Sequence, residues 1–202
     1  MQRGLLIVIS GPSGVGKNTV ISSLFEQLPD LNYSISATTR TPRDNEVNGQ
    51  NYYFLTETEF LQKIDADEFL EWAKVYHHYY GTLKSNVLEL LAQGRDVVLD
   101  VDVQGGAAIK KALPETVLIF LAPPSLKELK NRLLGRSTER PEEIELRLQY
   151  IKTELQCIPY YDFLVINDQI DLTCEKIKGI ILAEKCRVTR QEIGFVQKLL
   201  GE

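Results

Sequence analysis

The residues that point most directly to chemistry form one glycine-rich stretch near the start of the chain. It reads Gly11-Pro12-Ser13-Gly14-Val15-Gly16-Lys17-Asn18-Thr19 and follows the apolar run 5–10. The spacing G-x-x-x-x-G-K is typical of a phosphate-binding turn between a strand and a helix, because glycines let several backbone N–H groups approach an oxyanion. The helix start adds the positive end of its dipole, and Lys17 can reach the β- and γ-phosphates of a nucleoside triphosphate. The stretch therefore predicts a site for the phosphates of ATP; an ordinary strand-to-helix turn is the alternative.

Position 18 departs from this pattern. The pattern has Ser or Thr after the lysine, and that hydroxyl binds Mg²⁺, whereas this chain has Asn18. An amide oxygen can ligate Mg²⁺, but its reach and geometry suit a tight octahedral ion less well. Thr19 lies about 100° further around the helix, so it does not simply take over the position.

A second cluster combines arginines and tyrosines. Arg40 and Arg43 lie on a polar, proline-broken loop, with Tyr52 and Tyr80 further along the same part of the chain. Guanidinium forks and phenol hydroxyls together form a receptor for a terminal phosphate. Two solvated surface arginines are the alternative.

Two acids follow the apolar run 97–99. Asp100 and Asp102 stand where a buried parallel strand ends, and an acid at this place in a phosphate-turn fold commonly holds Mg²⁺ directly or through water. We therefore expect Asn18 and Asp100 to be the protein groups nearest the metal. The alternative is that the two acids cap a neighbouring helix.

A third cluster is a set of arginines on either side of a polar loop. Its members are Arg132, Arg136, Arg140 and Arg147. Positive charge brought to a transferring phosphoryl group stabilises its oxygens, and a loop that closes excludes water. The alternative is a solvated basic face paired with neighbouring glutamates, which we prefer for Arg140.

The elements that must position these groups follow from the apolar pattern. Apolar runs at 5–10, 97–101, 117–121 and 163–166 predict buried strands, and segments of helical periodicity lie between them. We expect Tyr33–Ala37 to form one strand, 69–76 another, and Trp72 to be buried. Capping-box spacing predicts helices after Thr56 and Ser125. The alternation of strands and helices predicts an α/β fold, a doubly wound parallel sheet with ligands at the carboxyl ends of its strands.

The segmentation also predicts domain organisation. Residues 1–33 and 81–202 are expected to form the phosphate-turn core, and residues 34–80 a small mixed subdomain inserted into it. The chain of 202 residues, with 44% hydrophobic and 25% charged residues, suits one compact globular unit.

Charge, apolar runs and cysteine content indicate which partners and which cellular compartment to expect. A net charge of −5 argues against a nucleic-acid partner, and no apolar run is long enough to cross a bilayer, so no membrane partner is expected. The phosphate turn lies too near the start to leave room for a signal peptide. Three widely spaced cysteines suggest neither disulfides nor a zinc site. We expect a cytoplasmic protein; its oligomeric state is left open.

Taken together, seven segments resemble the guanylate kinase family and cover nearly the whole chain in order. They are GPSGVGK (11–17), ATTRTPR (37–43), EVNGQNYYF (46–54), EFLEWAKVYHHYYGT (68–82), LDVDVQG (99–105), FLAPPS (120–125) and VIND (165–168). The resemblance implies a P-loop NTPase core, a subdomain that binds a nucleoside monophosphate, and a lid at about 135–147. It implies transfer of the γ-phosphoryl group of ATP, with Mg²⁺, to GMP or dGMP.

The resemblance also implies roles for individual residues. The monophosphate would be bound by Arg40, Arg43, Tyr52 and Tyr80, and guanine by Ser36, Glu71, Thr82 and Asp102. The polyphosphate would contact the glycine stretch, Arg132, Arg136 and Arg147, with Asn167 and Asp168 near adenine. One carboxylate can accept both the N1–H and N2–H₂ donors of guanine, which adenine lacks, so Glu71 is expected to select the base.

Two other functions remain open at this point. A guanylate-kinase-like domain can be a non-catalytic module that binds peptides, although Lys17 and the glycines are intact here. The chain could instead be a kinase for adenylate or uridylate, which Glu71 opposes. Turnover with GMP, AMP and UMP in parallel separates these possibilities.

Overall fold

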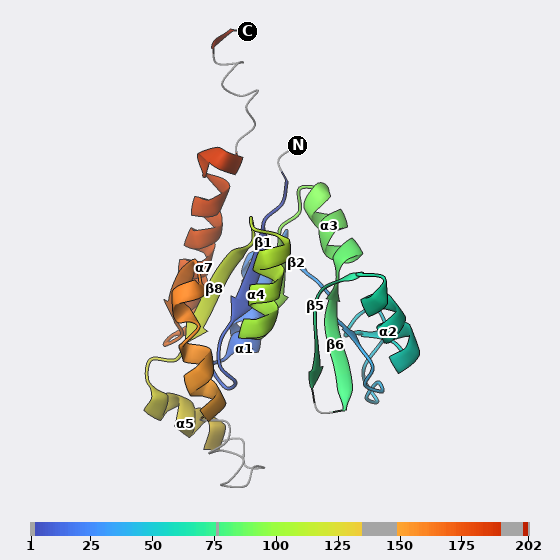
Figure 1. Ribbon diagram of the computed structural model, residues 1–202. Coiled ribbons are helices and arrows are strands. Elements are labelled where there is room, and N and C mark those ends of the chain that lie inside the picture. The colour runs from blue at the N-terminus through green and yellow to red at the C-terminus, as the bar shows by residue number, and fades with distance from the viewer. Residues whose placement is uncertain (1–2, 76, 135–148, 191–199, 202) are drawn as a thin grey trace.

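The computed structural model describes residues 3–75, 77–134, 149–190 and 200–201, and these build two β-sheets that stand beside each other (Figure 1). The larger sheet is entirely parallel, with the strand order β2-β7-β1-β8-β9. Its strands are β1 (Leu6–Ser10), β2 (Asn32–Tyr33), β7 (Val97–Asp100), β8 (Val117–Ala122) and β9 (Phe163–Ile166).

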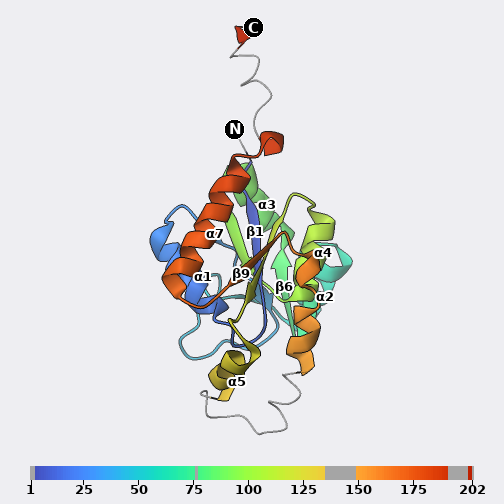
Figure 2. The ribbon, with the colours of Figure 1, turned by 90° about the vertical axis from the view of Figure 1, so that its left-hand side faces the viewer.

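Both faces of this sheet are covered by helices, which explains why its central strands read as continuous apolar runs. Ile7 and Ile9 of β1 pack with α1 (Lys17–Gln27) and α7 (Ile170–Lys185) on one face. Leu6 and Val8 point to the other face, into a cluster shared with α3 (Lys84–Ala92) and α4 (Val103–Ala112). Figure 2 shows the sheet between α1 and α7 on one side and α4 on the other. The predicted doubly wound α/β fold is confirmed.

The smaller sheet lies to one side and has its own core. Its strand order is β4-β3-β6-β5, and α2 (Glu57–Asp65) packs on it. The ring of Phe60 in α2 stacks on Phe69 with the centroids 4.4 Å apart. Thr56 and Glu59 form both hydrogen bonds of the predicted capping box. The strands are β3 (Ala37–Thr38), β4 (Tyr53–Phe54), β5 (Phe69–Val75) and β6 (His78–Leu83).

The expectation of one strand over Tyr33–Ala37 is wrong. Tyr33 ends β2 in the larger sheet, and Ala37 begins β3 in the smaller one, so residues 34–36 cross between the sheets. The alternating pattern arises because each end of the segment is part of a different sheet.

The expectation of a buried Trp72 is also wrong, since this side chain is 47% exposed. Trp72 lies on β5, which is an edge strand, and its ring packs against Tyr79 with the centroids 6.0 Å apart. An edge position leaves the other side of the ring to solvent.

The remaining helices lie at the two ends of the larger sheet. The loop after β1 and α5 (Leu126–Leu134) are at the same end, where the strands finish (Figures 1 and 2). The backbone N–H of Glu128 donates to Ser125 Oγ at 3.1 Å, as the predicted cap requires. Residues 149–155 are helical and precede β9, with the short turns η1 (Ile158–Tyr160) and η2 (Val188–Arg190) further on. No helix within the described ranges is both long and apolar enough to cross a bilayer.

Candidate active site

The glycine stretch forms a tight turn between β1 and α1. Gly11 has φ = 155°, and a Cβ there would lie 2.1 Å from the carbonyl oxygen of Leu121 on β8. Gly16 caps α1 in the left-handed region with φ = 100°. A side chain at either position is excluded by contact or by conformation, so the turn requires glycine. Val15 turns its side chain into the core, and only its backbone faces the turn.

Lys17 is held across the mouth of this turn. Its Nζ donates to the carbonyl oxygen of Gly11 at 2.8 Å and lies 3.9 Å from Oδ1 of Asp100 at the end of β7. Burial raises the pKa of Asp100, and the ammonium of Lys17 opposes that shift. The result is a partly buried cation and anion, 18% and 21% exposed, at the carboxyl ends of two neighbouring strands.

A cavity of about 360 Å³ opens over the turn, and we call it the phosphate cavity. Backbone N–H groups at a helix start together with a lysine suit a polyphosphate. The lining residues are Gly11, Pro12, Ser13, Gly14, Gly16, Lys17, Asn18, Thr19, Asp100, Val101, Asp102 and Glu154.

Glu154 is a lining residue that the sequence analysis missed. It lies on the helical residues 149–155, three positions after the buried Ile151. Burial raises the pKa of Glu154; Lys17 opposes this shift and Asp102 adds to it. The sequence does show that Glu154 lies next to the apolar face of an amphipathic helix. It does not show which cavity this helix lies beside, so the residue could not be assigned to the site.

A larger cavity of about 720 Å³ lies between the two sheets, and we call it the acceptor cavity. It collects five of the residues expected to bind the monophosphate nucleotide, and it adds Tyr33 and Asn51, which the sequence analysis missed. The five are Ser36, Tyr52, Glu71, Tyr80 and Asp102. Tyr33 stands at the end of β2, beside β7, so its place at the site depends on the strand order, which the sequence does not give.

Glu71 is the central acid of the acceptor cavity. The hydroxyl of Thr82, itself fully buried, donates to Glu71 Oε1 at 2.6 Å. Burial raises the pKa of Glu71, the hydrogen bonds from Thr82 oppose the shift, and the charge of Asp102 adds to it. Asp102 also caps α4, because its Oδ1 accepts from the backbone N–H of Gly105 at 2.8 Å. The hydrogen bond from Thr82 therefore orients the carboxylate of Glu71, and the capping of α4 holds the carboxylate of Asp102 in place.

Neither Arg40 nor Arg43 is among the residues that line the acceptor cavity. Nη2 of Arg40 is 2.8 Å from Oε1 of Glu46, and the guanidinium lies over the Tyr52 ring at 5.5 Å. Tyr52 and Tyr80 are also in contact, with ring centroids 6.2 Å apart. The Arg43 side chain is exposed and is not among the lining residues of either cavity. Arg40 is therefore joined to the acceptor cavity through Tyr52, whereas Arg43 is not.

On the other side of the turn, two side chains hold the Val15 carbonyl. Nδ2 of Asn167 donates to it at 2.7 Å, and Nη1 of Arg132 at 3.3 Å. Asn167 is buried after β9 and accepts from Thr173 Oγ1 at 3.1 Å, whereas Asp168 is exposed. The lid expected at about 135–147, with Arg136, Arg140 and Arg147, lies outside the described residues.

The two cavities adjoin each other. Asn18, Asp100, Val101 and Asp102 line both of them. An anion bound over Lys17 and a ligand bound beside Glu71 would therefore meet along one wall, at the carboxyl ends of β1 and β7. This arrangement suits transfer of a group between two bound molecules, in which positioning and charge do most of the catalytic work.

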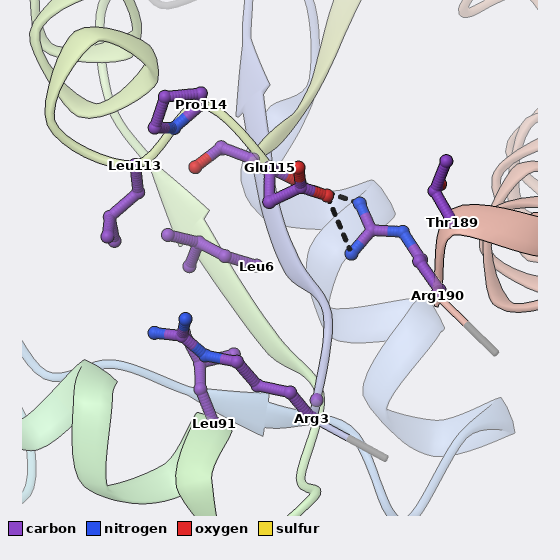
Figure 3. A pocket seen from close by; sticks show the side chains of 10 residues that line it. Arg3, Leu6, Leu91, Leu113, Pro114, Glu115, Thr189 and Arg190 are labelled. Carbon is purple, nitrogen blue, oxygen red and sulfur yellow. Dashed lines mark hydrogen bonds and ion pairs between the residues drawn. The ribbon is translucent and has the colours of Figure 1, made fainter. Parts of the chain in front are cut away.

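Another cavity, of about 320 Å³, lies at the opposite end of the larger sheet (Figure 3). Its walls come from Gly4 and Leu6 at the start of β1 and from residues 113–116 before β8. Glu115 is paired with Arg190, whose Nη2 donates to the Glu115 carbonyl at 2.7 Å and whose Nη1 lies 3.8 Å from its carboxylate. Its lining includes neither a glycine turn nor a lysine, so we do not assign phosphoryl chemistry to it.

Comparisons with known proteins agree with this geometry. The guanylate kinase family model matches residues 3–184. The chain is 54% identical to the guanylate kinase of Caldanaerobacter subterraneus subsp. tengcongensis, over 95% of this chain and 93% of the relative. It is 50% identical to that of Syntrophomonas wolfei subsp. wolfei, over 93% and 96%. The crystal structure of guanylate kinase from Anaplasma phagocytophilum matches with a TM-score of 0.78 and 31% identity, covering 98% of this chain and 94% of that one. The chain therefore belongs to the guanylate kinase family, whose members are ATP:GMP phosphotransferases.

Proposed function

We propose that this chain is a Mg²⁺-dependent guanylate kinase that transfers the γ-phosphoryl group of ATP to GMP or dGMP in the cytoplasm. The single observation that carries this proposal is the wall shared by the phosphate and acceptor cavities, formed by Asn18 and 100–102. It lets two nucleotides place their phosphates next to each other. The three cysteines are free thiols, which suits a reducing compartment.

ATP is proposed to bind with its phosphates in the phosphate cavity. The glycine turn supplies N–H donors, and Lys17, already directed at the Gly11 carbonyl, supplies the charge. Arg132 lies beside the turn through its contact with Val15. By the family resemblance, Arg136 and Arg147 act on the same phosphates, and Asn167 and Asp168 lie near adenine.

GMP is proposed to bind in the acceptor cavity, between a core of residues 1–33 and 81–202 and an inserted subdomain of residues 34–80. Its phosphate would contact Arg40, Arg43, Tyr52 and Tyr80, and its base would contact Ser36, Glu71, Thr82 and Asp102. Glu71 is well placed for base choice, because Thr82 occupies one carboxylate oxygen from behind and holds the group in place. AMP would leave this buried acid facing a ring nitrogen without a proton, which costs affinity.

The phosphate cavity contains oxygen atoms that could act as ligands of Mg²⁺. Asp100 and Asn18 both line it and offer hard oxygen ligands, and Mg²⁺ in nucleotide sites usually takes one or two carboxylates plus phosphates and water. Within the described ranges no three His, Cys, Asp or Glu residues gather as a metal cluster, consistent with an ion held largely by its substrate. When bound, Mg²⁺ would be held by Asp100 and Asn18 and would offset the negative charge of the transferring phosphates.

In the transfer itself the chain mainly positions the reactants and stabilises charge. The ammonium of Lys17 faces the bound phosphates, and the charge of Asp100 near it keeps the lysine oriented. Arg132 adds positive charge at the end of α5. The smaller sheet covers the acceptor from one side, so closing it over the larger sheet would exclude water from the transferring group.

The direct test is an assay of ADP formation with ATP, Mg²⁺ and, in parallel, GMP, dGMP, AMP or UMP. We expect turnover with GMP and dGMP that disappears when Mg²⁺ is chelated. Turnover with AMP or UMP instead would assign the chain to another nucleoside monophosphate kinase. Binding of GMP without turnover would identify a non-catalytic module.

A further inference from the structure

Asn18 differs from the rest of the glycine stretch in the direction it faces. Within 11–19 it is the one residue that lines the acceptor cavity as well as the phosphate cavity. Lys17 and Thr19, on either side of it, line only the phosphate cavity.

Helix geometry explains this orientation. The acceptor cavity is also lined by Ile21, Ser22 and Phe25, which are three, four and seven residues after Asn18 on α1. Residues with this spacing share one face of a helix. Asn18 is therefore the first residue of the α1 face that is turned toward the acceptor, and its side chain stands at the border between the two cavities.

The side chain has the chemistry to use this position. Asn18 is exposed, and its amide makes no hydrogen bond to any residue in the part of the chain that the structure describes. An amide carries an acceptor oxygen and two N–H donors, so its oxygen can face a metal while its nitrogen faces another ligand. The neighbouring wall residues oppose a phosphate, because Asp100 and Asp102 are acids and Val101 is apolar. Among the four side chains of this wall, only that of Asn18 offers hydrogen-bond donors.

We propose that Nδ2 of Asn18 donates a hydrogen bond to a phosphate oxygen of the bound nucleoside monophosphate, so that Asn18 positions the acceptor. This inference rests on the proposed function and assigns the residue a role on the acceptor side that neither Lys17 nor Thr19 can fill from where they lie. It makes the asparagine at this position a substrate-positioning group as well as a metal ligand. A serine side chain is shorter and would reach less far across the wall.

The test measures binding of GMP and of guanosine by calorimetry, with neither ATP nor Mg²⁺ present. In the Asn18→Ala protein we expect GMP affinity to fall about tenfold, the usual loss for a hydrogen bond to a charged group. Asn18→Asp keeps the shape but replaces the donor with a negative charge, and we expect a larger fall. Guanosine lacks the phosphate, so its affinity should be the same in all three proteins.

A matched control is Ser23→Ala, which also lies on α1 but lines neither cavity and should keep the GMP affinity of the parent protein. Unchanged GMP affinity in both Asn18 variants would overturn the inference. So would an equal fall for guanosine or an equal fall in Ser23→Ala, since each would indicate a general change in α1 or in the cavity rather than a lost hydrogen bond to the phosphate. Circular dichroism melting shows that each variant is folded. If the parent chain does not bind GMP at all, the proposed function fails, and this inference fails with it.

Discussion

The phosphate cavity takes most of its lining from one continuous stretch, 11–19, whereas the acceptor cavity collects its lining from α1, from β2 and β7 of the larger sheet, from β5 and β6 of the smaller one, and from loops. In the first, backbone N–H groups and three glycines with positive φ, at positions 11, 14 and 16, shape the turn, so most of its geometry is set by neighbouring residues. In the second, side chains from both sheets must meet. The comparison teaches that donor binding is set locally and acceptor choice is set by tertiary structure.

The largest effect is expected from the donor side. Lys17→Ala removes the ammonium that is hydrogen-bonded across the glycine turn, and we expect kcat to fall about 10³-fold, comparable to the loss of a strong transition-state donor. Initial rates of ADP formation at saturating GMP measure this effect. Lys178→Ala, which removes a lysine on α7 bonded to Gln27 far from the turn, is the matched control and should keep full activity. Comparable rates for the two variants would contradict the role of Lys17.

The next effect belongs to the acceptor side. Glu71→Gln exchanges the carboxylate for an amide that cannot accept two guanine donors, so kcat/KM for GMP should fall about 10²-fold or more while KM for ATP hardly changes. The ratio of kcat/KM values for GMP and AMP is the quantity to measure. Glu68→Gln on the same part of the chain, where the exposed Glu68 pairs with Lys63, should leave that ratio unchanged. A preserved preference for GMP in the Glu71 variant would rule out base selection by this residue.

A pH profile sharpens the same comparison. Burial raises the pKa of Glu71 above the ordinary value of 4.5, and guanine needs the ionised form. As pH is lowered, guanosine affinity should therefore begin to fall at a higher pH than an exposed glutamate would give, by about tenfold for each pH unit below the raised pKa. Guanosine is the better ligand because it has no phosphate that titrates.

Two variants check the origin of this profile. Glu71→Gln should remove the dependence, and Asp102→Asn should move it to lower pH, because the charge of Asp102 contributes to raising the pKa of Glu71. A profile that is identical in Glu71→Gln would assign the dependence to another group.

The smallest effect is expected from Asn167, whose hydrogen bond to the Val15 carbonyl supports the glycine turn. Asn167→Ala removes the 2.7 Å donor of the Val15 carbonyl and leaves the Thr173 hydroxyl only its longer 3.4 Å bond to the Ile166 carbonyl, which costs about 1–3 kcal/mol. We expect Tm to fall by about 2–4 °C per kcal/mol and KM for ATP to rise severalfold, with KM for GMP nearly unchanged. Thr173→Val removes the bonds of the Thr173 hydroxyl but keeps the one from Asn167 to the Val15 carbonyl, and it should give a smaller change. A rise in KM for GMP as large as that for ATP would mean that the two cavities are not supported separately.

The same difference decides what could be predicted from the sequence. The glycine stretch, its strand and its helix were predictable, because the turn is built from neighbouring residues whose spacing reflects their geometry. The fold class was predictable because apolar runs such as that of β1 are buried on both faces. Residues 34–36 were misassigned, since local alternation does not reveal that a chain leaves one sheet for another.

Residues that join the site from distant segments were harder to find. Glu154 is well over 100 residues from the turn that it faces, and only the path of the helical residues 149–155 brings it there. Tyr33 reaches the acceptor cavity because β2 pairs with β7, a neighbour that chain order does not suggest. Trp72 was misplaced for a related reason, because the pattern of a strand does not show whether it lies at an edge.

The most direct measurement is the binding of a bisubstrate ligand, adenosine and guanosine joined through their 5′ oxygens by a chain of five phosphates. If the two cavities meet along the wall of Asn18 and 100–102, one molecule should bind per chain, roughly 10²–10⁴-fold more tightly than ATP or GMP alone, and displace both. Binding no tighter than ATP alone, or displacement of only one nucleotide, would contradict a shared site for phosphoryl transfer.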